Sequence, residues 1–203
     1  MDCMEAMAKM KDNQFDLAIV DPPYGSPDDA LEKDKDNSTK HSAKRTNYKV
    51  FKNVAPTPKY WKELKRVSKN QIVWGGNFFG LKGGVIAWNK NGTAFGEGEV
   101  AICTTHNSVK FFEYTWNGML QGDMKNKERR IHPTQKPVAL YKWILHNYAK
   151  PGDKILDTHS GSASLAIACH DYGFDLEAYE IDEDYFNDAM KRLNNHIKQL
   201  SLF

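Results

Sequence analysis

The sequence predicts a doubly wound α/β fold, in which helices cover both faces of a mostly parallel sheet. Short apolar segments alternate with segments of helical periodicity along the 203 residues, a pattern typical of strands joined by crossover helices. The apolar segment at 15–20 is continuous rather than alternating, and such a run suits a strand buried on both faces of a parallel sheet. A strand, a turn that contains glycine, a helix and a further strand follow one another at 154–182, as in one βαβ unit.

Seven strands are expected from the apolar runs. They are placed at 15–20, 71–76, 84–90, 99–105, 108–114, 154–157 and 174–182. The fourth and fifth of these are close enough to form a hairpin through His106 and Asn107.

Helices are expected where apolar residues recur at helical spacing. They are placed at 2–12, from Pro58 to Val67, from Pro137 to Tyr148, from Ser160 to Cys169, and at the end of the chain. The last helix is expected to have an apolar face made of Phe186, Met190, Leu193 and Ile197. The whole chain, 1–203, is expected to form a single domain, because its length suits one α/β core.

The composition excludes several classes of protein. The chain is 40% hydrophobic and 27% charged, which is ordinary for a globular protein. The first residues lack the pattern of a signal peptide and no uncharged apolar stretch reaches bilayer length, so we expect a cytoplasmic protein without membrane contact. The three cysteines are far apart and the seven histidines lack ligand spacing, so we expect reduced, mostly buried thiols and no metal.

Basic side chains gather in two segments that lack periodicity. The net charge of +2 and the pI near 8.3 are too mild to indicate nucleic-acid binding by themselves. Segment 26–52 is long and polar and contains Lys44 and Arg45, and a loop of this length inside a compact domain is usually functional or disordered. Segment 115–131 ends with Arg129 and Arg130. Taken alone, either cluster can also be an ordinary solvated surface.

A first group of chemically suited residues, Asp21-Pro22-Pro23-Tyr24, follows the strand at 15–20. Ligands of open α/β sheets bind just outside the carboxyl ends of strands. An exocyclic amine on a base is a weak nucleophile, and the Asp21 carboxylate and Pro22 carbonyl can accept its N–H bonds and stabilise the charge that develops. The tandem prolines fix the local chain, and the Tyr24 ring offers a face on which an extruded base can stack.

A second group begins at Asp157, at the end of the strand at 154–157. The turn Thr158-His159-Ser160-Gly161-Ser162 leads into a helix, and Glu180 follows the next strand at about the offset of an acid that grips ribose hydroxyls. The turn has one glycine and therefore lacks the cradle that holds a pyrophosphate. S-adenosylmethionine, which has no pyrophosphate, needs no such cradle.

In this order, the two groups resemble the motifs of the DNA amino-methyltransferases whose catalytic motif precedes the cofactor motif. Asp21–Tyr24, Trp74-Gly75-Gly76-Asn77, His132–Pro137 and 155–164 carry the resemblance, which runs over nearly the whole chain. The resemblance implies a Rossmann-like, seven-stranded methyltransferase sheet, S-adenosylmethionine as methyl donor, double-stranded DNA as substrate and flipping of the target base. It favours adenine N6 as the acceptor and is compatible with a homodimer, with a cognate restriction enzyme, and with a bacterial or phage origin.

The resemblance also assigns roles to individual residues. Asp157 and Gly161 are expected near the methionine moiety of the cofactor and Glu180 on its ribose. The full set of expected cofactor residues is Asp157, Thr158, His159, Ser160, Gly161, Ser162, Glu180, Thr134, Gln135 and Lys136, of which the last three lie near the cofactor's carboxylate. Asp21, Pro22, Pro23 and Tyr24 are the expected catalytic residues. DNA is expected to meet a flexible loop at 26–52 and a short target-recognition segment at 115–131, through Lys44, Arg45, Arg129 and Arg130.

The chain departs from the family's pattern at the cofactor loop. Thr158 and His159 stand where Pro-Phe is common, and Ala163 stands where a second glycine is common. Three alternatives stay open: methylation of cytosine N4, methylation of a protein amide, and a DNA-binding module or subunit that has lost catalysis. A digest of the methylated DNA separates the two bases, and cofactor binding separates an enzyme from a decayed relative.

Overall fold

A computed structural model describes residues 1–25, 53–92, 96–117 and 120–200. The strands are β1 (Phe15–Val20), β2 (Ser68–Trp74), β3 (Gly84–Asn89), β4 (Gly98–Cys103), β5 (Val109–Glu113), β6 (Lys154–Asp157) and β7 (Asp175–Ala178). The helices are α1 (Cys3–Met7), α2 (Pro58–Val67), the 3-10 helix η3 (Gly76–Phe79), α3 (Val138–Tyr148), α4 (Ser164–Tyr172) and α5 (Glu183–Leu200). In the described part of the chain, no helix is both long enough and apolar enough to cross a membrane.

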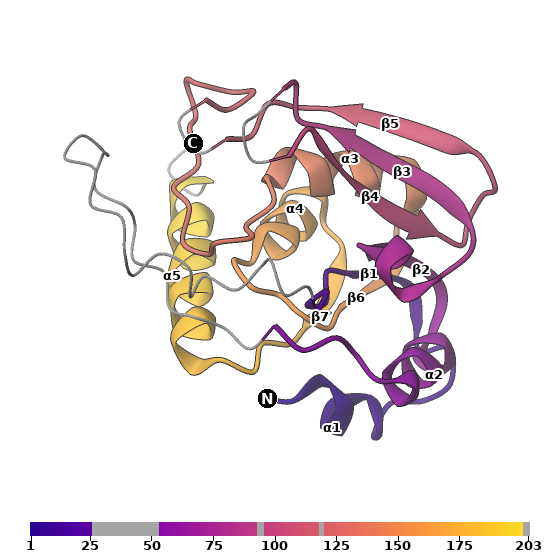
Figure 1. Ribbon diagram of the computed structural model, residues 1–203. Helices are drawn as coiled ribbons and strands as arrows, with labels where there is room; N and C mark the ends of the chain where they lie inside the picture. The colour runs from indigo at the N-terminus through magenta and orange to yellow at the C-terminus, as the bar shows by residue number, and fades with distance from the viewer. Residues whose placement is uncertain (26–52, 93–95, 118–119, 201–203) are drawn as a thin grey trace, which may run out of the picture.

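The described strands form one seven-stranded sheet in the order β5-β3-β4-β2-β1-β6-β7 (Figure 1). Neighbouring strands are parallel except around β4, which runs antiparallel to both β2 and β3. The predicted fold class is therefore confirmed: the chain is a doubly wound α/β protein with a mostly parallel seven-stranded sheet. The expected DNA-contacting loop at 26–52, with Lys44 and Arg45, lies outside the described residues.

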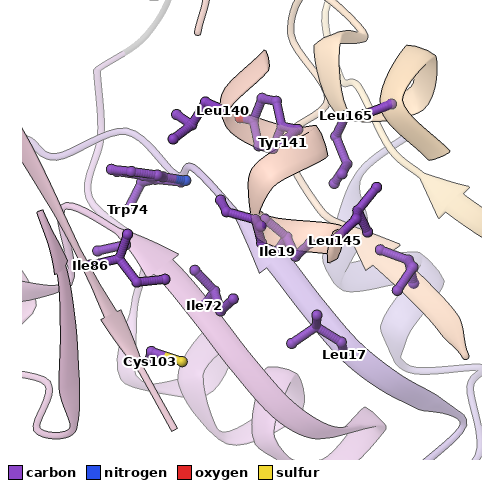
Figure 2. Close-up of a cluster of buried hydrophobic side chains, with 14 of the residues drawn as sticks. Leu17, Ile19, Ile72, Trp74, Ile86, Cys103, Leu140, Tyr141, Leu145 and Leu165 are labelled. Carbon is purple, nitrogen blue, oxygen red and sulfur yellow. The ribbon is translucent and has the colours of Figure 1, made fainter. Parts of the chain in front are cut away.

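From Leu17 to Val20, the side chains of β1 alternate between two hydrophobic clusters, one on each face of the sheet. Leu17 and Ile19 belong to the cluster that includes α3 and α4 (Figure 2). Ala18 and Val20 belong to the cluster that includes α1 and α2. Because successive residues of a strand point to opposite faces, this one apolar run supplies both cores.

The sheet has a topological switch point between β1 and β6. These strands are parallel neighbours, with Leu17 opposite Ile155 and Ala18 opposite Leu156. The connection from β1 to β2 includes α2, whose buried side chains lie on one face, while α4 joins β6 to β7 across the other face. Continuing the register brings Asp157 level with Ile19, so the carboxyl ends of β1 and β6 open side by side. A ligand site is expected at such a point.

The predicted hairpin of strands 99–105 and 108–114 is wrong. β4 has β2 and β3 as its neighbours, so β5 pairs instead with β3, and in parallel. His106 lies in the connection and turns it away from β4, because its carbonyl accepts a hydrogen bond from Gly84 N and its ring stacks on Tyr148.

The predicted apolar face of the last helix is also wrong in part. Phe186 and Met190 are exposed, whereas Tyr185 and Ala189 are buried. Tyr185 packs edge-on against His132, and Arg192 on the same side of α5 donates to the carbonyl of Ser162. These polar and aromatic contacts, and not the aliphatic residues alone, determine the rotation of α5 about its axis.

Two element boundaries differ from the expectation near the cofactor loop. The helix expected from Ser160 begins at Ser164, because Gly161 and Ala163 both have left-handed backbone conformations with φ of +49° and +59°. The strand expected at 174–182 ends at Ala178. Beyond it, the Glu180 carboxylate accepts hydrogen bonds from the backbone N–H groups of residues 181 and 182 and turns the chain out of the sheet.

The packing of α3 on the sheet gives a stability prediction. Ile144 is completely buried, so Ile144→Ala should lower the free energy of unfolding by about 2–5 kcal/mol through lost burial and a residual cavity. His146→Ala, on the exposed side of the same helix, should change it by less than about 0.5 kcal/mol. Urea denaturation of the two variants measures the difference, and equal losses would contradict this packing.

Candidate active site

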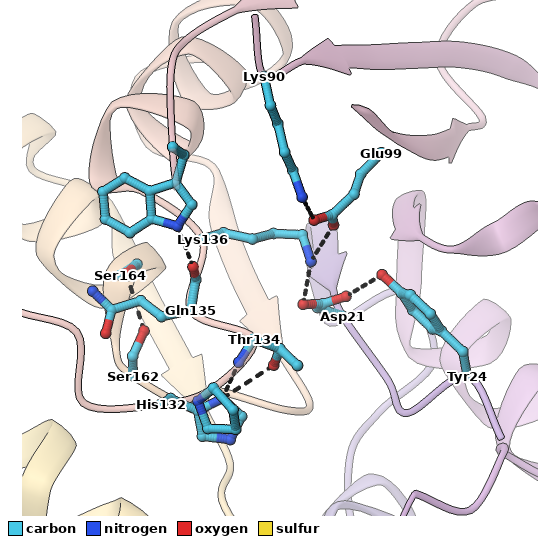
Figure 3. A network of polar contacts seen from close by, with 12 residues as sticks. Asp21, Tyr24, Lys90, Glu99, His132, Thr134, Gln135, Lys136, Ser162 and Ser164 are labelled. Carbon is cyan, nitrogen blue, oxygen red and sulfur yellow. Dashed lines mark hydrogen bonds and ion pairs between the residues drawn. The ribbon is translucent and has the colours of Figure 1, made fainter. Parts of the chain in front are cut away.

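The Asp21 carboxylate lies directly after β1, at the switch point of the sheet. Its Oδ1 accepts a hydrogen bond of 2.8 Å from the Tyr24 hydroxyl, and its Oδ2 lies 2.5 Å from Nζ of Lys136 (Figure 3). Two partners therefore hold the carboxylate. Because the side chain is 17% exposed, it still reaches the surface of the site.

The Tyr24 ring is positioned by the segment that follows β2. It stacks on Phe78, with ring centroids 5.2 Å apart and planes at 29°, and meets Phe79 edge-on at 6.2 Å. A Cβ at Gly75 would lie 2.3 Å from Cε1 of Tyr24, and Gly75 also has a left-handed φ of +64°. Only glycine fits both conditions at this position. Gly75, the first glycine after β2, therefore makes room for the tyrosine ring.

Lys136 is a buried cation between two carboxylates. Its side chain is 3% exposed, and Nζ lies 2.5 Å from Asp21 Oδ2 and 3.0 Å from Glu99 Oε2. The ammonium also lies 5.3 Å from the centre of the Trp74 ring, within range of a cation–π interaction. Burying an ammonium is strongly unfavourable unless it is paired and hydrogen-bonded, so both carboxylates are needed to hold it there.

Glu99 and Lys90 extend this arrangement toward the β3–β4 connection. Nζ of Lys90 lies 2.5 Å from Glu99 Oε1, and it stands 4.9 Å from the centre of the Trp88 ring. The four side chains Lys90, Glu99, Lys136 and Asp21 thus form a row of alternating charges that sum to zero when all are ionised (Figure 3). We call this row the charge relay.

The ionisation of the charge relay follows from burial and from the neighbouring charges. Burial raises the pKa of Asp21 while the Lys136 ammonium opposes the rise. Burial would also raise the pKa of Glu99, but the ammonium groups of Lys136 and Lys90 lower it to about 2. Burial alone would lower the pKa of Lys136, whereas the two carboxylates raise it well above its ordinary value. Lys136 and Glu99 therefore remain charged at neutral pH, whereas burial works against the charged form of Asp21.

The second group of residues surrounds Asp157 at the end of β6. Asp157 is 4% exposed, and its Oδ1 accepts a hydrogen bond of 3.0 Å from His159 N. Burial raises the pKa of Asp157 to about 7 against this hydrogen bond, and the charges of Asp21 and Glu180 add to the rise. A buried carboxylate of this kind suits a cationic ligand, because a nearby positive charge favours its ionised form.

Thr158 and His159, two of the three departures from the family's pattern, are held by Tyr60 of α2. Thr158 Oγ1 lies 2.6 Å from the Tyr60 hydroxyl and 2.9 Å from His159 Nδ1. The His159 ring meets Tyr60 edge-on at 5.6 Å, and burial lowers the pKa of His159 to about 4. At neutral pH, the loop therefore carries an uncharged histidine packed against an aromatic ring.

The remainder of the loop is closed by Glu180. Its Oε2 accepts a hydrogen bond of 2.9 Å from Gly161 N, and Ser160 N donates to the Tyr179 carbonyl at 2.8 Å. Ser162 lies inside, where its Oγ is 3.1 Å from Ser164 Oγ. Glu180 therefore keeps the loop after β6 against the end of β7.

Residues 132–137 run from the cofactor loop to Asp21. The His132 ring lies 3.9 Å from the position of a Cβ on Gly161, and its Nδ1 lies 3.0 Å from Thr134 Oγ1. Gln135 is buried, with its carbonyl accepting from Trp116 Nε1 at 2.7 Å. Of the three residues expected near the cofactor's carboxylate, Thr134 is exposed, whereas Gln135 and Lys136 are committed to contacts inside the protein. The segment joins the two halves of the site.

The two arginines expected to contact DNA in segment 115–131 differ in their exposure to solvent. Arg129 is exposed. Arg130 is partly buried, donates to the Pro133 carbonyl at 2.7 Å and lies 5.9 Å from the centre of the Trp116 ring. Arg130 thus stabilises the segment, and Arg129 is the one of the pair that is turned to solvent.

Several residues of the site were not identified from the sequence. Glu99 and Lys90 belong to the charge relay, and the Tyr60 hydroxyl contacts Thr158. Arg192 donates to the Ser162 carbonyl and to Glu128, with 2.5 Å between Arg192 Nη2 and Glu128 Oε2. A charged residue inside an apolar strand, such as Glu99 in the run at 98–103, is the one signal that could have identified the relay.

The residues present fit S-adenosylmethionine. The buried Asp157 carboxylate suits the positive charges of its sulfonium and ammonium groups, and the Glu180 oxygens can accept hydrogen bonds from ribose hydroxyls. The turn lacks a pyrophosphate cradle, which this cofactor does not need. A mostly parallel α/β sheet with such residues at the adjacent ends of β1 and β6 defines a cofactor-dependent α/β protein with its site at the switch point.

The chain belongs to the DNA methylase family, since residues 90–191 match the family model N6_N4_Mtase. A relative, the type II methyltransferase M.HpaI of Haemophilus parainfluenzae, is 24% identical over 95% of this chain and 72% of its own length. The suspected resemblance to the DNA amino-methyltransferases is confirmed.

Solved structures of DNA methyltransferases have the same fold. The M1.HpyAVI–SAM complex superposes with a TM-score of 0.58 at 18% identity, covering 95% of this chain and 96% of that one. The cytosine-N4-specific PvuII DNA methyltransferase superposes with a TM-score of 0.60 at 8% identity, covering 98% and 90%. At these identities the likeness concerns the fold.

Gly75 and Gly80 give a matched test of the packing around Tyr24. Both flank η3 with left-handed φ angles, of +64° and +65°, but a Cβ at Gly80 meets nothing within 4 Å. Gly80→Ala should therefore cost about 1–2 kcal/mol for the backbone alone. Gly75→Ala should cost more and should lower methylating activity at least tenfold, because the methyl group displaces the Tyr24 ring. Denaturation and activity assays on both variants measure this, and equal behaviour would show that Gly75 leaves Tyr24 undisturbed.

Proposed function

We propose that this protein transfers a methyl group from S-adenosylmethionine to N6 of adenine in double-stranded DNA. The observation that carries the proposal is the position of Asp21. It is a partly exposed carboxylate at the carboxyl end of β1, beside the end of β6 that bears Asp157. The family supports methylation of DNA, and the choice of adenine rests on the tendency of motifs that begin with aspartate to accompany that base.

Asp21 is proposed to orient the amine and to stabilise the charge that develops on its nitrogen. Each carboxylate oxygen has two lone pairs, so the hydrogen bonds from Tyr24 and Lys136 leave further acceptor capacity. The Pro22 carbonyl is proposed as the second acceptor, held in place by Pro23. With both N–H bonds engaged, the nitrogen lone pair points away from the acceptors.

Tyr24 is proposed to have two roles. Its hydroxyl holds Asp21 Oδ1 at 2.8 Å and thereby fixes the direction of the carboxylate. Its ring, supported by Phe78, offers an aromatic surface for the flipped base. Phe78 is 64% exposed, so the aromatic pair that it forms with Tyr24 reaches solvent.

The cofactor is proposed to bind between Asp157, the loop 158–162 and Glu180. When bound, S-adenosylmethionine supplies an electrophilic methyl group on a positively charged sulfur. Asp157 would hold the cationic part, and Glu180 the ribose. The adjacent ends of β1 and β6 bring these residues beside Asp21, so the acceptor and the donor share one site.

DNA is proposed to contact the segments 26–52 and 115–131. In the second of these, the exposed basic residues are Lys125, Lys127 and Arg129. Such side chains contact phosphates and supply affinity that depends on salt. Arg129 is the better candidate of the arginine pair, because Arg130 is used inside the segment.

Methylation of cytosine N4 is the second candidate. The fold matches that of the cytosine-N4-specific PvuII enzyme as well as it matches M1.HpyAVI. Both amines lie beside a ring nitrogen and need the same acceptors, so Asp21 and the Pro22 carbonyl serve either base. The two candidates differ only in the shape and edge of the base that must fit.

Transfer of labelled methyl from S-adenosylmethionine to unmethylated bacterial DNA tests the proposal. We expect label in N6-methyladenine after nucleoside digestion, and label in N4-methylcytosine would establish the second candidate. Asp21→Ala should lower kcat at least a hundredfold while the cofactor still binds, because Asp21 acts on the amine. Absence of label with wild-type protein that binds both cofactor and DNA would contradict the proposed activity.

Cofactor binding should depend on pH through Asp157. The pKa of this carboxyl is about 7 in the free protein, and a cationic ligand favours the ionised form, so binding releases a proton at lower pH. The dissociation constant should therefore fall by up to about tenfold per unit as pH rises toward 7, and level off above it.

Calorimetry in buffers of different ionisation enthalpy measures both the affinity and the released proton. Asp157→Asn should bind the cofactor weakly and without this pH dependence, because its amide does not titrate. A wild-type affinity that is independent of pH between about 5 and 7 would show that Asp157 does not face the cationic part of the ligand.

A further inference from the structure

The Lys136 ammonium is shared between two carboxylates, those of Asp21 and Glu99. Lys136 Nζ lies 2.5 Å from Asp21 and 3.0 Å from Glu99, and it has three N–H donors to distribute. Glu99 is itself shared, because its other oxygen lies 2.5 Å from Lys90. Asp21 and Lys90 are therefore linked through two intervening charges although they do not touch. A change at Lys90 or at Glu99 must alter how strongly Lys136 is held by Asp21.

We propose that Glu99 and Lys90 are positioning residues, which together set how far the Lys136 ammonium is drawn to Asp21 and thereby how strong an acceptor Asp21 is for the substrate amine. The inference rests on the proposed function, in which Asp21 accepts a hydrogen bond from that amine. If Lys136 bound Asp21 alone, it would neutralise the carboxylate and weaken it as an acceptor. If Lys136 were withdrawn, Asp21 would be left without a compensating charge in a mostly buried place.

Two buried tryptophans lie beneath the ammonium groups of the relay. Lys136 stands over Trp74 and Lys90 over Trp88, with each ammonium about 5 Å from its ring centre. Trp74 and Trp88 meet edge to face at 6.3 Å and are buried. Each ammonium group is therefore stabilised by a buried aromatic ring as well as by its carboxylate partners.

Substitutions in the relay should change the ionisation of Asp21 in opposite directions. The charged or titratable groups that act on Asp21 are Lys136, Glu99, Tyr24, Tyr141 and Asp157. Glu99→Gln removes a negative charge and leaves Lys136 to Asp21 alone, which lowers the pKa of Asp21. Lys90→Gln leaves Glu99 with only one ammonium, so Glu99 draws Lys136 away and the pKa of Asp21 rises.

The experiment measures the acid limb of kcat/KM for DNA at saturating cofactor, so that titration of Asp157 is suppressed. Glu99→Gln should move the midpoint down by about one pH unit or more, and should also lower kcat. Lys90→Gln should move it up by a smaller amount, and Lys90→Arg should restore the wild-type midpoint. The double variant Lys90→Gln/Glu99→Gln should lie between Glu99→Gln and the wild type, since its charge is balanced.

Lys69→Gln is the matched control. Lys69 pairs with Asp16 at 2.6 Å, and both residues lie at the amino ends of β2 and β1. Since a strand rises about 3.3 Å per residue, this pair is roughly 16 Å from Asp21 along β1. Its removal should leave the midpoint unchanged.

Titration of the Asp21 side-chain carboxyl carbon by NMR, in protein labelled at aspartate, gives a readout that needs no activity. It should show the same opposite shifts, and it separates failure of this inference from failure of the proposed function. A structural role alone would lower activity without moving the midpoint. Shifts of the same sign in both single variants, or no shift in either, would overturn the proposal. If Glu99→Gln does not fold, the upward shift in Lys90→Gln decides alone.

Discussion

The buried ion pair between Lys136 and Asp21 is the interaction on which the rest of the site depends. An ammonium that is 3% exposed is stable only beside carboxylates, and Asp21 and Glu99 supply them from the ends of β1 and β4. Lys136 arrives from the segment after β5, which must therefore run across the carboxyl ends of the central strands. The ion pair thus fixes the path of this segment, together with the position of Asp21.

That path couples the two halves of the site. The segment that ends at Lys136 begins at His132, which packs against Tyr185 and lies beside Gly161 in the loop after β6. The loop is in turn held by Glu180 on one side and by Tyr60, through Thr158, on the other. Because these contacts use side chains from different elements, a displacement of one half of the site is expected to displace the other half.

The proposed acceptor geometry at Asp21 does not by itself select between the exocyclic amines of adenine and cytosine. Asp21 and the Tyr24 ring form an acceptor beside an aromatic surface, an arrangement that suits both adenine and cytosine. The same fold occurs in a structure specific for cytosine N4. Under the proposed function, the choice between the two bases therefore rests on contacts other than those of Asp21 and the Tyr24 ring.

The sequence by itself determined the strand-and-helix order, the fold class and the placement of Asp21 and Asp157 at strand ends. These follow from local periodicity, from prolines and from short motifs. Only the tertiary structure decided that β5 pairs with β3, that α5 buries Tyr185 rather than Phe186, and that Glu99 and Lys90 join the site. The physical reason is that strand neighbours, helix rotation and ion pairs depend on packing between residues far apart in the chain, and no local pattern encodes it.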